Sequence, residues 1–260
     1  MDFLTAIIAG LMQGIFEWLP ISSQGNLLGI FVWLGSNPQE AIRLAVMLHI
    51  GTLLAAIVYF RKEIKQMLFT KGQNENEKRE NKILLTFIII ATLATIITAV
   101  PCYFFLEELL GSSVTFILLI LTILLIITGT IQLMKKKVGD GKLTTKNAIL
   151  TGLGQGFSVL PGISRSGTTT SVLLFRGFKP EDAFKISFIM SIPAVFLADV
   201  AYGIFKGFIF DEFAILALAI AFVVGLLSMD ILIKLAKKIN FAYFCFVLAI
   251  IYFIAFLLLL

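Results

Sequence analysis

The sequence predicts an all-α polytopic membrane protein, and three observations carry that prediction. Hydrophobic residues fill 59% of the 260 positions and charged residues only 14%, more apolar surface than one globular core could bury. Apolar runs of roughly 20 residues, the helical length that crosses about 30 Å of hydrocarbon, recur along the whole chain. These runs lack the strict alternation of polar and apolar residues that a membrane β-barrel requires.

Six of the apolar runs are long and continuous enough to be full membrane spans. Two other segments, 3–34 and 147–176, are apolar in part but are interrupted by Gly, Pro and Ser. Irregular backbone at membrane depth survives only where protein or a polar cavity satisfies its N–H and C=O groups. We therefore expect these segments to fold as two re-entrant helical hairpins. The predicted spans are about 41–60, 82–104, 112–134, 183–206, 211–234 and 240–260.

The basic residues lie in short loops and set the orientation, because Lys and Arg gather on the cytoplasmic side. We expect cytoplasmic loops at about 61–82 and 135–146, and an external link around Glu107, which has no basic residue nearby. Threading the spans through these loops makes 147–176 enter from the cytoplasm and 1–40 enter from outside. The net charge of +5 is then topogenic, and we expect no nucleic-acid partner.

An internal repeat supports this arrangement. A shift of 142 positions places Ser22 on Ser164 and Gly25 on Gly167. The predicted orientations of the two halves are opposite, as in inverted-repeat membrane folds whose sites lie between the repeats. We expect one membrane domain, 1–260, with repeat one at about 1–134 and repeat two at about 147–260, each a hairpin plus three spans. Further matching pairs are Gly10 with Gly152, Gln13 with Gln155, Gly14 with Gly156 and Pro38 with Pro180.

Two polar residues of the first hairpin are candidates for chemistry. Gln13 and Glu17 stand at i and i+4, so a helix presents them on one face. A carboxylate inside an apolar segment is costly and by default indicates a functional polar interior. The alternative is an interfacial Glu near the outer headgroups.

The second hairpin has the composition of a phosphate-binding turn. Arg165 lies between Ser164 and Ser166. Gly167 follows, and Thr169 begins an apolar run. Glycine permits close backbone approach, free N–H groups at a helix start bind anions, and a guanidinium offers a fork for phosphate oxygens. Serine caps without a ligand would look similar, but an arginine between apolar walls needs an anionic partner.

If the hairpins meet, Ser22 and Ser23 join Glu17 and Arg165 in a site suited to phosphoryl transfer. The arginine neutralises charge, a metal held by the acid polarises phosphate, and a hydroxyl or water attacks. His49 is the only histidine, which excludes a mechanism with two catalytic histidines. We expect it to be a helix-packing residue.

The stretch 10–25, with Gln13, Glu17 and a Leu-Pro-Ile-Ser-Ser turn, resembles the first signature of the undecaprenyl-diphosphatases of the BacA type. The Pro-Gly-Ile-Ser-Arg-Ser-Gly-Thr stretch at 161–168 resembles the second. Similarity also runs through 49–55 and 187–194, so the resemblance covers nearly the whole chain.

The resemblance implies an enzyme of the cell membrane that hydrolyses a C55 isoprenyl diphosphate to the monophosphate. This reaction recycles the lipid carrier for cell-envelope synthesis and is linked to bacitracin resistance. The resemblance also implies a divalent metal, Mg²⁺ or Ca²⁺, a site formed by both hairpins that opens to the external face, and a homodimer.

Carried over by position, the resemblance makes Glu17, Ser23 and Arg165 catalytic, with Ser23 the candidate nucleophile, and gives the metal to Glu17 and Gln13. One position departs from the family pattern, because Asn26 stands where a histidine is usual and an amide cannot exchange a proton near neutral pH. Either Asn26 positions phosphate or water while Glu17 manages protons, or activity is altered. The expected substrate-binding residues are Gln13, Ser22, Asn26, Ser164, Ser166, Gly167 and Thr169.

Two alternatives use the same features. Inverted repeats with broken helices are the usual architecture of secondary transporters, so the site could move an anionic isoprenyl-phosphate lipid as a transporter or flippase. A structural membrane subunit would use the small residues for packing, although Arg165 does not suit that role.

Overall fold

The computed structural model describes residues 2–69, 72–134, 139–208 and 210–260, and every regular element within them is helical. The basic run predicted at 135–137 lies outside the described residues. The helices are α1 (Phe3–Phe16), α2 (Ser23–Trp33), α3 (Pro38–Tyr59), α4 (Arg61–Leu68), α5 (Glu75–Leu110), α6 (Val114–Leu133), α7 (Thr145–Gly156), the 3-10 turn η1 (Phe157–Val159), α8 (Arg165–Phe175), α9 (Pro180–Lys206), α10 (Glu212–Lys238) and α11 (Ala242–Leu258).

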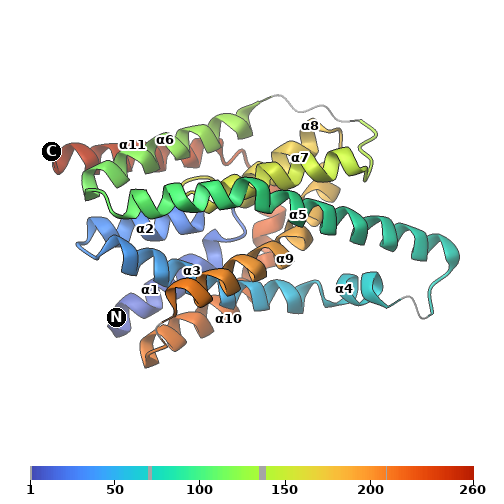
Figure 1. Ribbon diagram of the computed structural model, residues 1–260, viewed down its shortest axis with the longest axis horizontal. Helices are drawn as coiled ribbons and strands as arrows, with labels where there is room; N and C mark the ends of the chain where they lie inside the picture. Colours follow the sequence, from blue (N-terminus) through green and yellow to red (C-terminus); the bar gives the residue numbers. More distant parts are fainter. Residues whose placement is uncertain (1, 70–71, 135–138, 209) are drawn as a thin grey trace.

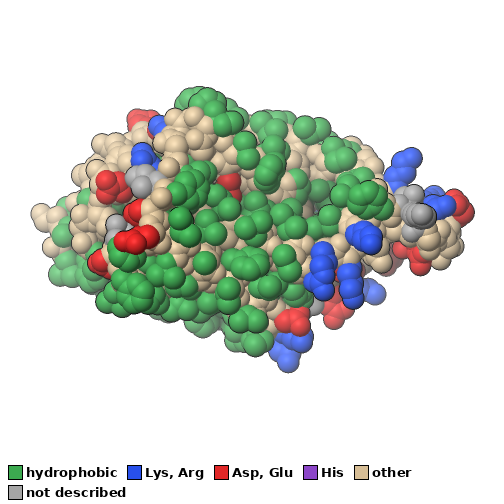
Figure 2. All heavy atoms as spheres, turned by 90° about the horizontal axis from the view of Figure 1, so that it is seen from below, with side chains coloured by type: hydrophobic (Ala, Val, Ile, Leu, Met, Phe, Trp, Pro, Cys, Tyr) green, Lys and Arg blue, Asp and Glu red, His purple; other side chains and the backbone are tan. Residues whose placement is uncertain are grey.

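The prediction of an all-helical, multi-pass membrane protein is confirmed. Within the described ranges, five helices are long and apolar enough to cross a membrane: α3, α5, α6, α9 and α10. α11 is also apolar but has 17 residues, so the count of six full spans stays a prediction. Figure 2 shows hydrophobic side chains over the middle of one face, with Lys and Arg gathered mainly toward one end, as a lipid-facing surface requires.

Two helical hairpins approach each other from opposite ends of the molecule (Figure 1). The first is α1 and α2, joined by the turn at 17–22, and the second is α7, η1 and α8, joined by the turn at 160–164. α1 packs along α10, α7 packs along α5, and α6 packs along α11. Each pair joins one predicted repeat to the other, so the halves interlock and the hairpin turns meet inside the molecule.

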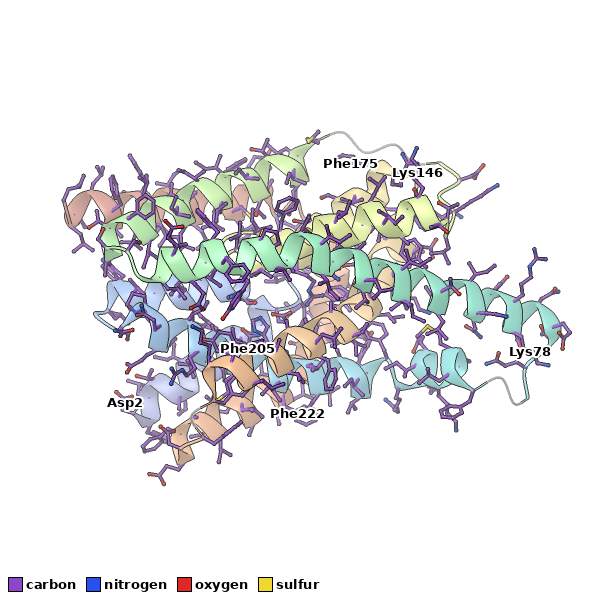
Figure 3. All side chains as sticks on the ribbon, viewed as in Figure 1. Asp2, Lys78, Lys146, Phe175, Phe205 and Phe222 are labelled. Carbon is purple, nitrogen blue, oxygen red and sulfur yellow. The ribbon has the colours of Figure 1, made fainter. Side chains whose placement is uncertain are left out.

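The stretch 61–82, expected as a loop, is mostly helical, because α4 and the first turns of α5 lie within it. Asn74 begins α5 with a capping box: its side chain accepts from the Glu77 N–H at 2.9 Å, and Glu77 accepts from the Asn74 N–H at 3.0 Å. Such reciprocal caps satisfy the free N–H groups of a helix start. Lys78 and Lys146, on segments expected to be cytoplasmic, lie toward one end and Asp2 toward the other (Figure 3).

Candidate active site

Glu17 lies at the centre of the site, directly after α1 and only 8% exposed. Gln13, one turn earlier, donates from Nε2 to Glu17 Oε2 at 3.1 Å and to Thr52 Oγ1 of α3 at 3.2 Å. The predicted shared face is therefore confirmed, and it points into the protein rather than toward the headgroups. Gln13 Oε1 is buried and has no hydrogen-bond partner among the described residues.

The two adjacent serines of the first turn have different tasks. Ser23 begins α2, and its hydroxyl donates to Glu17 Oε2 at 2.7 Å. Ser22 precedes it with a left-handed φ of 63°. Its Oγ accepts from the N–H of Gly25 at 3.3 Å and from the N–H of Gly162 at 3.0 Å. Ser22 therefore joins the two hairpin turns, while Ser23 reaches the carboxylate.

The second turn is built on the same plan. Ser164 caps α8 by accepting from the Gly167 N–H at 3.1 Å, just as Ser22 accepts from Gly25. Ser166 donates to Leu19 O at 3.4 Å and lies 3.4 Å from Ser164 Oγ. The serines predicted to hold phosphate therefore also hold the turns in place.

Gly25 allows the two turns to approach closely, because a Cβ at this position would lie 2.4 Å from the backbone nitrogen of Gly162. A backbone atom cannot move aside as a flexible side chain can. Gly167 is also crowded, because a Cβ there would lie 3.1 Å from Gln132 Nε2 and 3.2 Å from Ser164 Oγ. Gly25 is therefore required where backbone meets backbone, whereas a side chain at position 167 would need Gln132 and Ser164 to shift by a few tenths of an ångström.

Two polar residues of α6 hold both turns, and neither was expected from the sequence. Gln132 donates to Pro20 O of the first turn at 2.7 Å. Thr128 donates to Gly162 O of the second turn at 2.7 Å and accepts from the Ser164 N–H at 3.3 Å. Buried backbone groups of irregular segments need such partners. A polar side chain on the buried face of an apolar span is the signal that could have found them.

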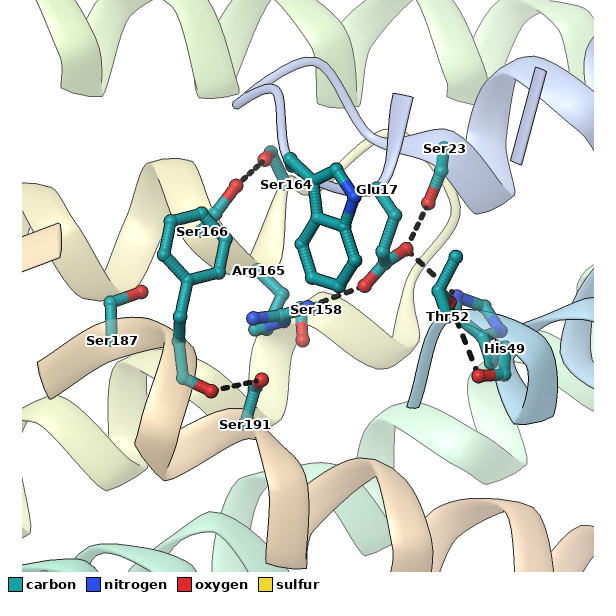
Figure 4. Close-up of polar contacts among 12 residues, drawn as sticks. Glu17, Ser23, His49, Thr52, Ser158, Ser164, Arg165, Ser166, Ser187 and Ser191 are labelled. Atoms are coloured by element: carbon teal, nitrogen blue, oxygen red, sulfur yellow. Dashed lines mark hydrogen bonds and ion pairs between the residues drawn. The ribbon is translucent and has the colours of Figure 1, made fainter. Parts of the chain in front are cut away.

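Arg165 begins α8 and brings the second hairpin to Glu17. Its Nη2 donates to Glu17 Oε1, and the two groups form an ion pair (Figure 4). The Phe188 ring of α9 lies 5.8 Å from the guanidinium carbon. Nη1 is buried and has no hydrogen-bond partner among the described residues. A buried guanidinium with donors to spare is suited to an anion that adds to Glu17.

Asn26 and Thr169 do not contact Glu17. The Asn26 amide donates to Ile21 O at 2.8 Å and Ser22 O at 2.9 Å, and its Oδ1 accepts from the Tyr252 hydroxyl at 3.1 Å. Both ends of this amide are therefore occupied by protein. Thr169 Oγ1 donates to Arg165 O at 2.8 Å and lies 2.6 Å from Ser187 Oγ. Their predicted contact with substrate stays a prediction, and their visible role is to shape the two turns.

His49, which we expected to be a helix-packing residue, lies at the site. Its Nε2 is 3.4 Å from Glu17 Oε2 (Figure 4). The small cavity beside Glu17 is also lined by Ser191, the residue that the shift of 142 positions places on His49. The packing role expected for His49 stays a prediction, and the structure places its imidazole beside the carboxylate of Glu17. Its place one turn before Thr52 on α3 is the signal that could have indicated a polar helix face. The cavity is lined by Glu17, Trp18, Thr52, Leu53, Ala56, Arg165, Ser191 and Val195.

Comparison with known proteins decides the family. The family model described as "Bacitracin resistance protein BacA" matches residues 6–252. The chain belongs to the BacA family. Among similar members, undecaprenyl-diphosphatases of Methanococcoides burtonii and Methanothrix thermoacetophila are 39% and 40% identical, over 92% and 94% of this chain and 93% of each relative. The undecaprenyl-diphosphatase of Haloarcula marismortui is 38% identical over 93% of both chains.

In this BacA family member, a carboxylate, a hydroxyl and a guanidinium from two interlocked hairpins converge on one point. Glu17 binds Ser23 and Gln13 through Oε2 and Arg165 through Oε1. The acid and the arginine lie 148 positions apart in the sequence. The resemblance predicted this convergence, and the hairpin geometry produces it.

Proposed function

We propose that this protein hydrolyses a polyprenyl diphosphate, undecaprenyl diphosphate in the first instance, to the monophosphate and inorganic phosphate, and so recycles the lipid carrier. The observation that carries the proposal is Arg165, whose Nη1 is unpartnered among the described residues and lies beside a carboxylate and a hydroxyl. The names of the relatives, undecaprenyl-diphosphatase, support the same reaction. An all-helical membrane fold suits a lipid-linked substrate.

Three residues have different roles in the proposed reaction. Arg165, at the start of α8, binds the terminal phosphate and neutralises the charge that develops on it. Ser23 Oγ, or a water beside it, attacks the terminal phosphorus, and its proton goes to Glu17. The bond from that phosphorus to the bridging oxygen breaks, and its electron pair leaves with the polyprenyl monophosphate. If Ser23 attacks, water then releases phosphate from the serine.

We also propose a divalent metal, Mg²⁺ or Ca²⁺, at Glu17 and Gln13. No group of three His, Cys, Asp or Glu side chains in the described ranges could hold a metal alone. The donors nevertheless fit: Gln13 Oε1 is a buried oxygen without a partner in the described part of the chain, next to the Glu17 carboxylate. Mg²⁺ is commonly held by one or two protein oxygens together with substrate phosphates. When bound, the metal would polarise the phosphate oxygens.

We further propose that the protein lies in the cell membrane with its site open to the external face. The first hairpin, which carries Glu17 and Ser23, is the one whose loops lack basic residues, and basic loops remain cytoplasmic. A homodimer stays a prediction from the resemblance.

The test is phosphate release from undecaprenyl diphosphate by the purified full-length protein in detergent, with Mg²⁺ or Ca²⁺. We expect release to fall roughly 100-fold or more in Arg165→Lys, because the planar fork is lost, and in Glu17→Gln. Arg176→Lys, at the other end of α8, is the matched control and keeps full activity. Well-folded wild-type protein that releases no phosphate with either metal would contradict the proposal and favour lipid binding or transport.

A further inference from the structure

The imidazole of His49 lies beside the carboxylate of Glu17 inside the protein. Its Nε2 is 3.4 Å from Glu17 Oε2, and its side chain is 14% exposed. Asp199 of α9 contributes to the electrostatic environment of His49; its carboxyl group is buried, and its Oδ2 has no hydrogen-bond partner among the described residues. Ionisable side chains inside a membrane span usually have a functional role rather than serving only to pack helices together.

The two oxygens of Glu17 are held from different directions. Oε2 accepts hydrogen bonds from Gln13 of α1 at 3.1 Å and from Ser23 of α2 at 2.7 Å, and His49 Nε2 of α3 lies 3.4 Å from it. Oε1 faces Arg165 of the second hairpin. Gln13 and Ser23 both belong to the first hairpin, so His49 is the neighbour of Oε2 that comes from a long helix outside the hairpins.

Asn26 cannot serve this purpose. It stands where the family usually has histidine, but Ile21 O, Ser22 O and Tyr252 occupy its amide. The imidazole beside Glu17 comes instead from α3, and the backbone of the same residue accepts from Thr52 Oγ1 at 3.1 Å.

We infer that His49 is a positioning residue for Glu17: its Nε2–H donates to Oε2 and fixes the direction in which the carboxylate faces Ser23 and the bound phosphate. This inference rests on the proposed function. It predicts a loss of turnover rather than of substrate affinity, because His49 acts through Glu17 and Arg165 still binds the phosphate.

The kinetic test compares His49→Leu, which removes the donor, with His49→Gln, which keeps an N–H at similar reach. We expect His49→Leu to lower kcat roughly 10- to 100-fold while KM stays within about threefold, since small misplacements of a reacting group cost this much. His49→Gln should recover most of the lost kcat. Thr122→Val, a buried hydroxyl of α6 that donates to its own helix, is the control. Wild-type kcat in His49→Leu, or an equal loss in both His49 variants, would overturn the inference.

A second readout does not depend on hydrolysis. In a double-mutant cycle of His49→Leu and Glu17→Gln, we expect the shifts in Tm to depart from additivity by about 2–4 °C, since the two side chains are in contact. Additive shifts would show that the contact carries no energy and would overturn the inference. This readout remains decisive if wild-type protein releases no phosphate, so failure of the proposed function is recognised separately.

Discussion

Replacing Ser22 and Ser23 separately by alanine should give opposite phenotypes, although the two residues are neighbours. Ser22 Oγ accepts from two buried N–H groups, at 3.0 and 3.3 Å. An unsatisfied buried donor costs about 1–3 kcal/mol, and the longer bond counts for less, so Ser22→Ala should lose about 2 kcal/mol. In a chain of this size that corresponds to a Tm decrease of about 4–8 °C.

Ser23→Ala removes a single short hydrogen bond to a carboxylate, at 2.7 Å. Such charge-assisted bonds contribute about 1.5–3 kcal/mol, which corresponds to a kcat decrease of about 10- to 100-fold if the bond is used in the transition state. A nucleophilic Ser23 would raise that loss. We expect Tm to change by less than about 2 °C, because Glu17 keeps Gln13 and Arg165 as partners and no buried N–H loses its acceptor, so the folded state recovers most of the lost bond.

Tm is measured by intrinsic fluorescence and kcat by phosphate release on the same preparations. For Ser22→Ala, phosphate release is measured below the Tm of the variant, and kcat is calculated per folded molecule. The folded fraction of Ser22→Ala should keep activity within about fivefold. The reasoning is refuted if Ser22→Ala is as stable as wild type and inactive, or if Ser23→Ala unfolds early but turns over normally. Either result would mean that the two hydroxyls have exchanged roles.

Three further substitutions test the packing of the turns. Gly25→Ala should prevent folding or lower Tm by more than about 8 °C, because its Cβ would lie 2.4 Å from the Gly162 nitrogen; normal yield and Tm would contradict the close approach. Gln132→Leu removes the donor to Pro20 O and should cost about 1–3 kcal/mol of stability, whereas an unchanged thermal melt would show that another group satisfies this carbonyl. Asn26→His, which restores the family's usual residue, should lower Tm and leave kcat no higher, because the amide site is enclosed by Ile21, Ser22 and Tyr252; a rise in kcat at unchanged Tm would show that this position faces the substrate.

Much of the architecture follows from local sequence. Apolar length predicted the helices, and the Gly, Pro and Ser clusters predicted the turns at 17–22 and 160–164. The site residues Glu17 and Arg165 could be found because charges inside apolar segments require partners. The helical part of 61–82 was missed because its polarity suggested a loop, although the Asn74 capping box was readable.

Contacts across the fold could not be predicted in the same way. His49 looked like a packing residue because nothing within α3 shows that α1 ends beside it. Gln132 and Thr128 support two turns that are distant in sequence. Asn26 seemed a substrate ligand because it follows the signature, but its direction is set by Tyr252 of α11. In each case the deciding neighbour belongs to another element.

The internal repeat separates scaffold from chemistry. Ser22 and Ser164, which match in the two halves, do the same structural work, because each accepts from the N–H three residues later. The next positions differ, and there the chemistry lies, with Ser23 in one half and Arg165 in the other, both on Glu17.

The same division extends to the spans. His49 reaches Glu17, while its repeat counterpart Ser191 lines the same cavity and donates within its own helix to Phe188 O at 2.7 Å. The two turns, which match in sequence, begin α2 at Ser23 and α8 at Arg165, and both of these side chains reach Glu17; helix starts of this kind suit an anion. The proposed reaction needs two different groups there, a hydroxyl that attacks and a guanidinium that binds phosphate. The matching serines therefore keep the two turns alike, while the positions that follow them, Ser23 and Arg165, differ and bring different groups to Glu17.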